Sequence, residues 1–415
     1  MKRLATGLFA GGVLLCAGAA RLSAQPFFAG IGSLDGGTLG SIAEGVSADG
    51  AVVSGDSRLN AFYPNEGVIW TRDQGLRSIV PGRYSDCEGG GINGTGTVVT
   101  GGIVGNGTRY VYRWTPETGA VDLGDLDGGK FRSGATGVSA RGDVVVGYGA
   151  SDNGDWEAFR WTEETGMVGL GDLPGGNFGS SATAISADGF VVVGSSSNEF
   201  GNVAFRWTEE TGMVSIGELA GGRVSGWASG VSADGAVVVG SSWAEDGLRG
   251  FRWTSEAGMV ALEKIHPDQY QQRVYATSWD GNVMIGDAYV NGVGGAGLMY
   301  WTLQDGPRWL LDVFDEHGVV VPDEWSLDGV LGLSADGRTI VGYGRISGLG
   351  TQGWVAYLGP TCRADYDDDG TVTTADVSAY LLAWQQRSIF ADWNYDGYIN
   401  TIDIIGFLNE WAAGC

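Results

Sequence analysis

Two acidic segments near the end of the chain carry residues whose types and spacing suit calcium binding. The first runs from Asp365 to Asp376 and has carboxylates at positions 1, 3 and 5, a glycine at position 6 and an aspartate at position 12. Calcium prefers six to eight oxygen ligands, and such a loop supplies them from carboxylates and from the backbone carbonyl of position 7. The predicted ligands of a first ion are therefore Asp365, Asp367, Asp369, Thr371 and Asp376.

A second copy of this pattern follows 27 residues later. One such run would be weak evidence, but two in register, each followed by a helical pattern, are specific. Apolar residues recur at i, i+3, i+4 and i+7 after each loop, which predicts two short helices packed together. They are Val377, Tyr380, Leu381 and Trp384, then Ile404, Phe407, Leu408 and Trp411. The predicted ligands of a second ion are Asp392, Asn394, Asp396, Tyr398 and Asp403.

The rest of the chain offers little catalytic chemistry. Its only histidines, His266 and His317, do not lie in a metal-binding spacing. Gly292–Gly297 fits a dinucleotide fingerprint, but no helix is expected after it, so we assign it no cofactor. Enzymes that cleave glycosidic bonds use paired carboxylates, and no pair of acids stands out. We predict no catalytic residue. If the chain is an enzyme, the acidic stretch 314–325 is the first place to look, although a short surface helix is the simpler interpretation.

The composition is that of a folded, acidic protein. The chain has 415 residues, 75 of them glycine, and 43% are hydrophobic, so it can bury a core. Its 49 acidic and 24 basic residues give a formal net charge of −25. Such a surface repels phosphates and anionic lipids, so we expect no nucleic-acid partner.

The start of the chain predicts export. Residues 1–24 combine basic residues with a following apolar run, as a signal peptide does. No later run is long enough to span a membrane. Export makes a disulfide permissible, and Cys362 and Cys415 are the expected pair because they bracket the acidic segments. Cys87 is left over.

The elements that must position these residues are repeated. Seven copies of the motif G-V-S-A-D-G-x-V-V-V-G follow one another at intervals of 46, 46, 47, 46, 46 and 56 residues. Each copy has four short runs rich in Val, Phe and Trp, separated by turn residues. The Asp-Gly pair between the first two runs predicts a two-residue type I′ hairpin. Four antiparallel strands in each copy are typical of the blades of a β-propeller.

The two ends of the repeat region are expected to complete one blade. The seventh copy stops after Gly353–Leu358 without a fourth strand, and Ile31–Gly37 matches the fourth-strand motif G-D-L-x-G-G. Joining them leaves no exposed edge. We therefore predict an all-β, seven-bladed β-propeller over residues 25–361, closed by the N-terminal strand. A small all-α calcium-binding domain follows over residues 362–415.

Arginines in the third runs suggest ion pairs between neighbouring strands. Three of them are followed twelve residues later by an acid: Arg113 by Asp125, Arg160 by Asp172 and Arg206 by Glu218. In the fifth copy Arg252 is followed by Glu263, one position earlier, and in the sixth copy Tyr300 replaces the arginine. The first copy and the stitched copy lack both charges. We predict that each arginine pairs with its acid. A ring of ligand-binding arginines is the alternative.

The repeats resemble those of the HAF-type secreted repeat proteins of bacteria, which are named for a His-Ala-Phe run before a tryptophan. Glu157-Ala158-Phe159 and Val203-Ala204-Phe205 occupy that run here without the histidine. The resemblance covers about 330 residues. It implies export and a β-rich repeat fold, and it implies no established activity.

Residues 363–415 resemble a type I dockerin of the short bacterial kind that ends in Gly-Cys. Aspartate at position 12 of each loop and the tandem 27-residue repeat carry the resemblance. It implies two bound calcium ions and a cohesin partner recognised through loop positions 10 and 11. Here Thr374-Ala375 and Thr401-Ile402 supply half of the expected hydroxyls.

Two functions agree with these observations. In the first, an extracellular or cell-surface protein without catalytic activity displays propeller loops to an unidentified protein or glycan. Its calcium-loaded dockerin anchors it to a cohesin-like partner or to the cell surface. In the alternative, the propeller is a secreted carbohydrate-active enzyme, a glycoside hydrolase or lyase, because dockerins commonly accompany such enzymes. The missing carboxylate pair favours the first function.

Overall fold

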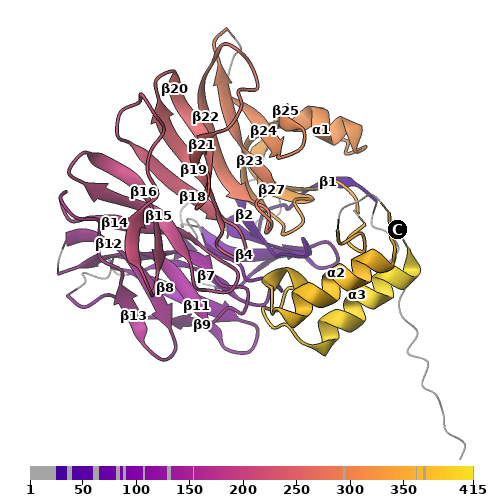
Figure 1. Ribbon diagram of the computed structural model, residues 1–415, viewed down its shortest axis with the longest axis horizontal. Helices are drawn as coiled ribbons and strands as arrows, with labels where there is room; N and C mark the ends of the chain where they lie inside the picture. Colours follow the sequence, from indigo (N-terminus) through magenta and orange to yellow (C-terminus); the bar gives the residue numbers. More distant parts are fainter. Residues whose placement is uncertain are drawn as a thin grey trace, which may run out of the picture.

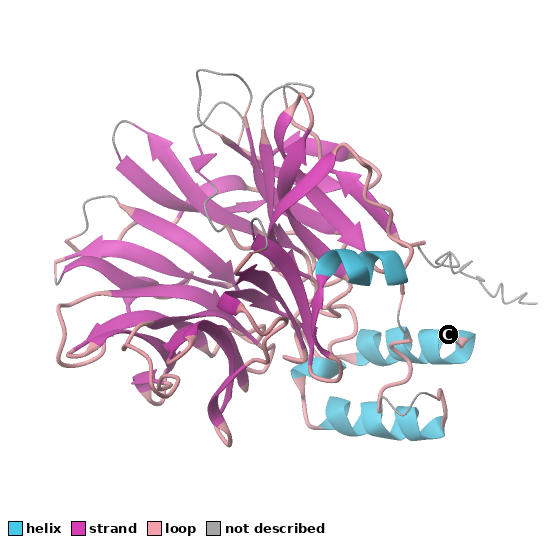
Figure 2. Ribbon diagram, turned by 90° about the horizontal axis from the view of Figure 1, so that it is seen from above, coloured by secondary structure: helices cyan, strands magenta, loops and turns pink. Residues whose placement is uncertain are grey.

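The computed structural model describes most of the chain. The described residues are 25–34, 40–58, 65–80, 85–86, 90–105, 108–128, 132–152, 154–292, 296–360, 362–367 and 371–414. The predicted signal peptide, Cys87, Asp369 and Cys415 lie outside them. The described chain is mostly β-strand (Figures 1 and 2). No helix in this part of the chain is both long and apolar enough to cross a membrane.

The described residues contain twenty-eight strands. They form five antiparallel sheets of four strands and one sheet of eight, in which β20 (Gly247–Thr254) also pairs in parallel with β22 (Gln269–Thr277). Dividing this sheet at the parallel pair gives seven units of four strands, which we number along the chain. Unit 1 contains β2 (Ser41–Val46), β3 (Val52–Ser57), β4 (Glu66–Thr71) and β5 (Gly75–Ser78). Unit 2 contains β6 (Ser85–Asp86), β7 (Val99–Gly105), β8 (Thr108–Thr115) and β9 (Gly119–Asp122). Unit 3 contains β10 (Ser133–Val138), β11 (Val144–Ser151), β12 (Gly154–Thr162) and β13 (Gly166–Gly169). Unit 4 contains β14 (Ser180–Ile185), β15 (Val192–Asn198), β16 (Gly201–Thr208) and β17 (Gly212–Ser215).

The remaining units follow the same order. Unit 5 contains β18 (Gly226–Val231), β19 (Val237–Ala244), β20 (Gly247–Thr254) and β21 (Gly258–Ala261). Unit 6 contains β22 (Gln269–Thr277), β23 (Val283–Val290), β24 (Ala296–Thr302) and β25 (Gly306–Trp309). Unit 7 contains β26 (Trp325–Leu333), β27 (Thr339–Ile346), β28 (Gly350–Tyr357) and the N-terminal β1 (Phe27–Gly30).

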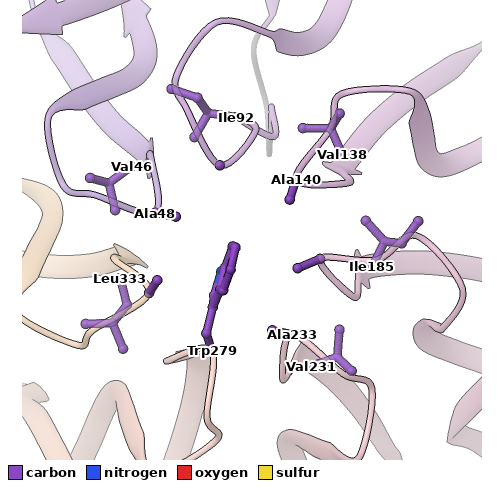
Figure 3. A pocket seen from close by; sticks show the side chains of 13 residues that line it. Val46, Ala48, Ile92, Val138, Ala140, Ile185, Val231, Ala233, Trp279 and Leu333 are labelled. Carbon is purple, nitrogen blue, oxygen red and sulfur yellow. The ribbon is translucent and has the colours of Figure 1, made fainter. Parts of the chain in front are cut away.

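The turns that follow the first strands meet around one axis. One residue of each turn donates its backbone N–H to the carbonyl of the equivalent residue in the next unit, at N–O distances of 2.8–3.3 Å. The seventh donor, Ala335, bonds to the first residue, Ala48, and so closes the ring. The members of this axial ring are Ala48, Gly94, Ala140, Ala187, Ala233, Trp279 and Ala335. Apolar side chains beside them line a central cavity of about 100 Å³ (Figure 3).

The N-terminal strand completes unit 7, but it begins earlier than the sequence predicts. β1 pairs antiparallel with β28, with Phe27 opposite Tyr357 and Gly30 opposite Trp354. Residues 31–34 follow the strand, and 35–37 lie outside the described residues. The same holds in unit 3, where β13 ends at Gly169, before the G-D-L-x-G-G motif. The motif leucine instead donates its backbone N–H to a serine of the next unit, as Leu34 does to Ser57 at 3.0 Å.

The Asp-Gly turns are four-residue loops, so the predicted type I′ hairpin is wrong. In unit 4, Ser186 N–H donates to the carbonyl of Val191, and Gly189 N–H donates to that of Ser186. Gly189 alone takes a positive φ, at 81°. The Asp188 carboxylate accepts from the Ser186 hydroxyl and from the backbone N–H of Phe190. The aspartate therefore holds the turn together, as the sequence predicts.

The third-strand arginines bind the neighbouring unit and not the acids predicted from the sequence. Arg206 Nε, for example, donates to the Gly235 carbonyl of the next turn at 3.2 Å. Arg113, Arg160 and Arg252 make the equivalent bond at N–O distances of 2.6–3.5 Å. The Tyr300 hydroxyl does the same in unit 6, which explains why that copy lacks the arginine. Among the described ion pairs, none joins these arginines to the predicted acids, because the acids lie beyond the fourth strand.

Because each arginine bonds a backbone carbonyl and not the acid, substitutions of the arginine and of the acid should change the free energy of unfolding independently. An ion pair would instead make the two effects depend on each other. Arg206→Met is expected to cost about 1–2 kcal/mol in urea unfolding, since it removes a hydrogen bond from a charged donor to the next unit. Combined with Glu218→Gln, the two effects should add to within about 0.5 kcal/mol. A double-mutant cycle with a coupling well above that value would restore the ion-pair interpretation.

A short helix, α1 (Leu310–Glu316), lies beside unit 6 and overlaps the start of the irregular stretch 314–325. It buries Leu310, Val313 and Phe314 in the core between units 6 and 7. Arg308 forms an ion pair with Glu316. Residues 314–316 of this stretch are helical, but 317–324 form a loop, and the helix packs between units 6 and 7 rather than over the ring.

The helical segment, residues 362–414, contains α2 (Thr374–Gln385), the 3-10 turn η1 (Ile389–Ala391) and α3 (Thr401–Ala413). Tyr380 and Phe407 stack with ring centroids 4.1 Å apart, and Trp393 packs edge-on against both. Leu381 and Leu408, which the sequence places in this core, are 41% and 39% exposed. Two short helices cover only a narrow stripe of each other, so the i+4 positions stay at the surface.

Candidate functional site

The first acidic loop gathers three of its predicted ligands. One carboxylate oxygen from each of Asp365, Asp367 and Asp376 lies within 4.8 Å of the others. Asp376 is buried and accepts backbone N–H groups from Thr373, Tyr366 and Asp367 at 2.6–3.2 Å. These hydrogen bonds, the one from Thr373 above all, hold the pKa of Asp376 below its usual range. The loop is therefore fixed around a negatively charged centre.

The second acidic loop repeats this hydrogen-bond scheme. Asp403 is buried and accepts backbone N–H groups from Trp393, Asn394 and Asn400 at 2.8–3.3 Å. Asp392 accepts from the backbone N–H groups of Asp396 and Gly397 at 3.1 and 2.7 Å. The three carboxylates of this loop do not all lie within 4.8 Å of one another among the described residues.

The electrostatics of the second loop favour a bound cation. Burial raises the pKa of Asp392 to about 7, and the neighbouring carboxylates of Asp403 and Asp396 add to this rise. Asn394 Nδ2 donates to Asp396 Oδ2 at 3.0 Å, and its Oδ1 accepts from the backbone N–H of Asp396 at 3.2 Å. The donor sets of both loops consist of oxygen atoms, most of them anionic. Such a set fits calcium rather than a softer metal.

The remaining predicted residues of this region are only partly described. Thr371 and Tyr398 lie in their loops at the surface, and both would offer a backbone carbonyl. Cys362 is disulfide-bonded. Its expected partner, Cys415, lies outside the described residues, so that pairing stays a prediction.

Sequence analysis missed a polar cluster in unit 6. The Tyr275 hydroxyl donates to Asp287 Oδ2 at 2.8 Å, and Arg273 Nη1 lies 4.0 Å from the same oxygen. Asp287 is only 8% exposed, and its Oδ1 is buried without a hydrogen-bond partner among the described residues. Burial raises the pKa of Asp287, although Tyr275 and Arg273 oppose this rise. Asp287 therefore holds an unsatisfied acceptor oxygen that is shielded from solvent.

Aromatic side chains border this cluster. Tyr270 is 42% exposed, and its ring centroid lies 6.2 Å from that of Tyr289. The guanidinium of Arg273 lies 5.6 Å from the Tyr289 ring. All of these residues belong to β22 and β23, in the parts of the strands away from the axial ring. Tyrosine faces beside charged and hydrogen-bonding groups suit the apolar faces and hydroxyls of a sugar.

One signal in the sequence points to this cluster. After the V-V-V-G run, β23 carries Asp287 where most copies have a small residue or a tyrosine. Only unit 1 shares the acid, as Asp56, and there Asn65 Nδ2 donates to Asp56 Oδ2 at 2.8 Å. Asp287 and Asp56 therefore differ in the residues around them. Comparing the residue types at this one position of the repeats does not reveal that difference.

Comparison with known proteins identifies the fold. No family model matches the chain, and no curated protein sequence matches it. Among solved structures, an oligogalacturonate lyase in complex with manganese superposes with a TM-score of 0.53 at 12% identity, covering 80% of this chain and 92% of that one. The oligogalacturonate lyase of Vibrio parahaemolyticus gives 0.56 at 11% identity, covering 80% and 97%. A prolyl endopeptidase gives 0.51 at 13% identity, covering 77% of this chain and 47% of that one. The chain therefore has a mostly β, propeller-like fold.

Proposed function

We propose that the protein is an extracellular, carbohydrate-directed protein built from two parts. The first is a seven-bladed β-propeller of the HAF-repeat type, residues 25–361, in which β1 closes the last blade. The second is a dockerin-like calcium-binding domain, residues 362–415. The closed axial ring, with one residue from each of the seven units, supports the blade count. The signal-peptide pattern of residues 1–24 supports export.

The dockerin-like domain binds two calcium ions in this proposal. The convergence of Asp365, Asp367 and Asp376 is the observation that carries this part. The matching hydrogen bonds of Asp376 and Asp403 support a second, equivalent site. A cohesin-like protein is the proposed partner of this domain. Its helices leave a set of large apolar side chains exposed, which suits a protein interface: Leu381, Leu382, Ile402, Ile405 and Leu408.

The propeller acts on, or binds, a polysaccharide. Two of the structural neighbours are oligogalacturonate lyases, which favours the carbohydrate-active alternative over non-catalytic binding. The observation on this chain that carries the proposal is Asp287, a buried carboxyl with a raised pKa in a cluster that includes the exposed Tyr270. A carboxyl that keeps its proton more readily than usual is a group suited to general-acid catalysis. Binding without cleavage is the second candidate.

The test is a glycan screen of the calcium-loaded, full-length protein. Acidic substrates such as polygalacturonate and neutral ones such as xylan are assayed for binding, for new reducing ends and for unsaturated products. Arg273→Met and Tyr270→Ala are expected to weaken binding about tenfold. Asp287→Asn is expected to lower any cleavage by at least about 100-fold, since general acid–base groups contribute about that much.

The matched control is Asp56→Asn, the same substitution at the equivalent position of unit 1. It should leave binding and cleavage unchanged. If Asp287→Asn and Asp56→Asn behave alike, the cluster is not the site. If no glycan is bound or cleaved by the folded protein, the carbohydrate proposal is wrong.

A further inference from the structure

The second acidic loop packs against the axial ring. Tyr395, at position 4 of that loop, is buried and holds a positive φ of 60°. Its ring packs edge-on against Trp279 with centroids 4.9 Å apart, and it also contacts Ala48 and Ala335. Figure 3 shows Trp279 projecting into the central opening. The loop therefore covers one mouth of the central cavity.

The turns of the axial ring depart from their own repeat where this loop meets them. The second residue of the Ser-Ala-Asp-Gly turn is alanine in five units and differs only at Gly94 and Trp279. Both differences touch Tyr395. A Cβ atom on Gly94 would lie 2.1 Å from the Tyr395 carbonyl oxygen, so only glycine leaves room for the loop. Trp279 supplies the aromatic contact.

At the third position of the turn, too, a residue that differs from the repeat contacts the second loop. It is aspartate in five units, but unit 3 has Arg141. Arg141 Nε donates to the Gly397 carbonyl at 2.8 Å, and its guanidinium lies 4.8 Å from the Tyr398 ring centroid. An aspartate there would place another carboxylate beside the acidic loop. Three separate departures from the repeat thus fit one loop.

A fourth contact with the axial ring comes from η1, outside the second loop. Ile389 of η1 packs among Ala140, Ala187 and Ala233, and Trp279 packs against the same cluster. Beside it lies a cavity of about 670 Å³ between the helical segment and the turns. Among the described residues, the contacts with the ring named here come from the second loop and η1.

We infer that the axial ring is a dedicated docking surface for the second loop, and that docking and calcium binding at this loop reinforce each other. This inference rests on the proposed calcium sites. The ring contacts the loop at Tyr395, Gly397 and Tyr398, and so it holds the backbone between Asp392 and Asp403 in one conformation. A ring that fixes this conformation raises the calcium affinity of the loop, and calcium must tighten docking by the same factor. The first loop makes no such contact among the described residues, and so should be independent of docking.

The test replaces the three contact residues of the ring with the residues found at the same turn positions in most other units. A triple variant with Gly94→Ala, Arg141→Asp and Trp279→Ala gives those turns the residues that most other units already carry, so the ring should stay folded. The matched control is Thr95→Asp, which also restores the repeat but lies at none of the contacts described above. Calorimetry of the full chain with calcium should show one affinity lowered about tenfold in the triple variant and the other unchanged. Asp365→Ala and Asp392→Ala assign each affinity to its loop.

Deuterium exchange supplies a readout of docking itself. Amides of residues 389–400 should exchange faster in the triple variant and slower after calcium is added to the wild type. If exchange in the triple variant matches the wild type, the docking surface is wrong. If exchange rises but both calcium affinities stay as in the wild type, the coupling is wrong. Absence of calcium binding at either loop of the wild type would instead overturn the proposed function, while exchange would still test the docking.

Discussion

Removing calcium from the full-length protein is expected to unfold α2 and α3 while the strands stay folded. Residues 363–415 carry eight aspartates and one glutamate against two arginines, a formal charge of −7. Without cations these carboxylates repel one another at short range. The core around Tyr380, Trp393 and Phe407 is too small to compensate. Calcium that binds only the folded state stabilises it by mass action. Circular dichroism with and without a chelator should show helix lost and regained.

The stoichiometry of binding makes this expectation specific. Calorimetry should give two ions for each chain, and Asp365→Ala and Asp392→Ala should each remove one. Glu410→Gln is the control, because it removes an acid of the same segment that lies outside both loops. It should leave the stoichiometry at two. Absence of binding at millimolar calcium would overturn the dockerin-like assignment.

Deleting residues 26–37 is expected to lower the melting temperature by roughly 5–10 °C and to cause aggregation. The deletion removes β1, so the hydrogen-bonding edge of β28 is left open to other chains. It also uncovers Trp354, which is fully buried and on which Phe28 stacks with centroids 5.9 Å apart. Differential scanning calorimetry and size-exclusion chromatography measure both effects.

Phe28→Ala separates packing from strand pairing. It removes the ring that contacts Trp325 and Trp354 but leaves the backbone of β1 in place. A smaller fall in melting temperature with monomeric elution is expected. If the deletion variant itself melts normally and elutes as a monomer, β1 does not close the ring.

Periodicity is the part of the fold that the sequence predicts well. The spacing of the seven motif copies indicates the four-stranded units, because a turn and two buried strands recur at the same places. Residue types alone do not predict strand ends or hydrogen-bond partners that depend on contacts with the next unit. The G-D-L-x-G-G motif looks like part of a strand, yet Leu34 uses its backbone N–H to bond the next unit. The arginines appear with acids in sequence, yet Arg206 bonds a carbonyl 29 residues ahead.

Of the candidate sites, too, some can be predicted from the sequence and others cannot. The acidic loops are predictable because their ligands are close in sequence and the ligand spacing is itself the motif. The cluster at Asp287 is not, because Arg273, Tyr275 and Asp287 come from two strands and form no motif. The docking surface is also hidden. Gly94, Arg141 and Trp279 look like ordinary variation in a repeat until Tyr395 is placed between them.

The pairing of β1 with β28 also sets the order in which the ring can be completed. β1 is the first strand to be synthesised and β28 the last, so unit 7 cannot form until nearly the whole repeat region exists. The other six units draw their four strands from adjacent sequence and can form locally. Joining the two ends is the contact with the longest sequence separation among the strand pairs, and such contacts slow folding. Ring closure is therefore a late step, which waits until nearly all of the repeat region has been synthesised.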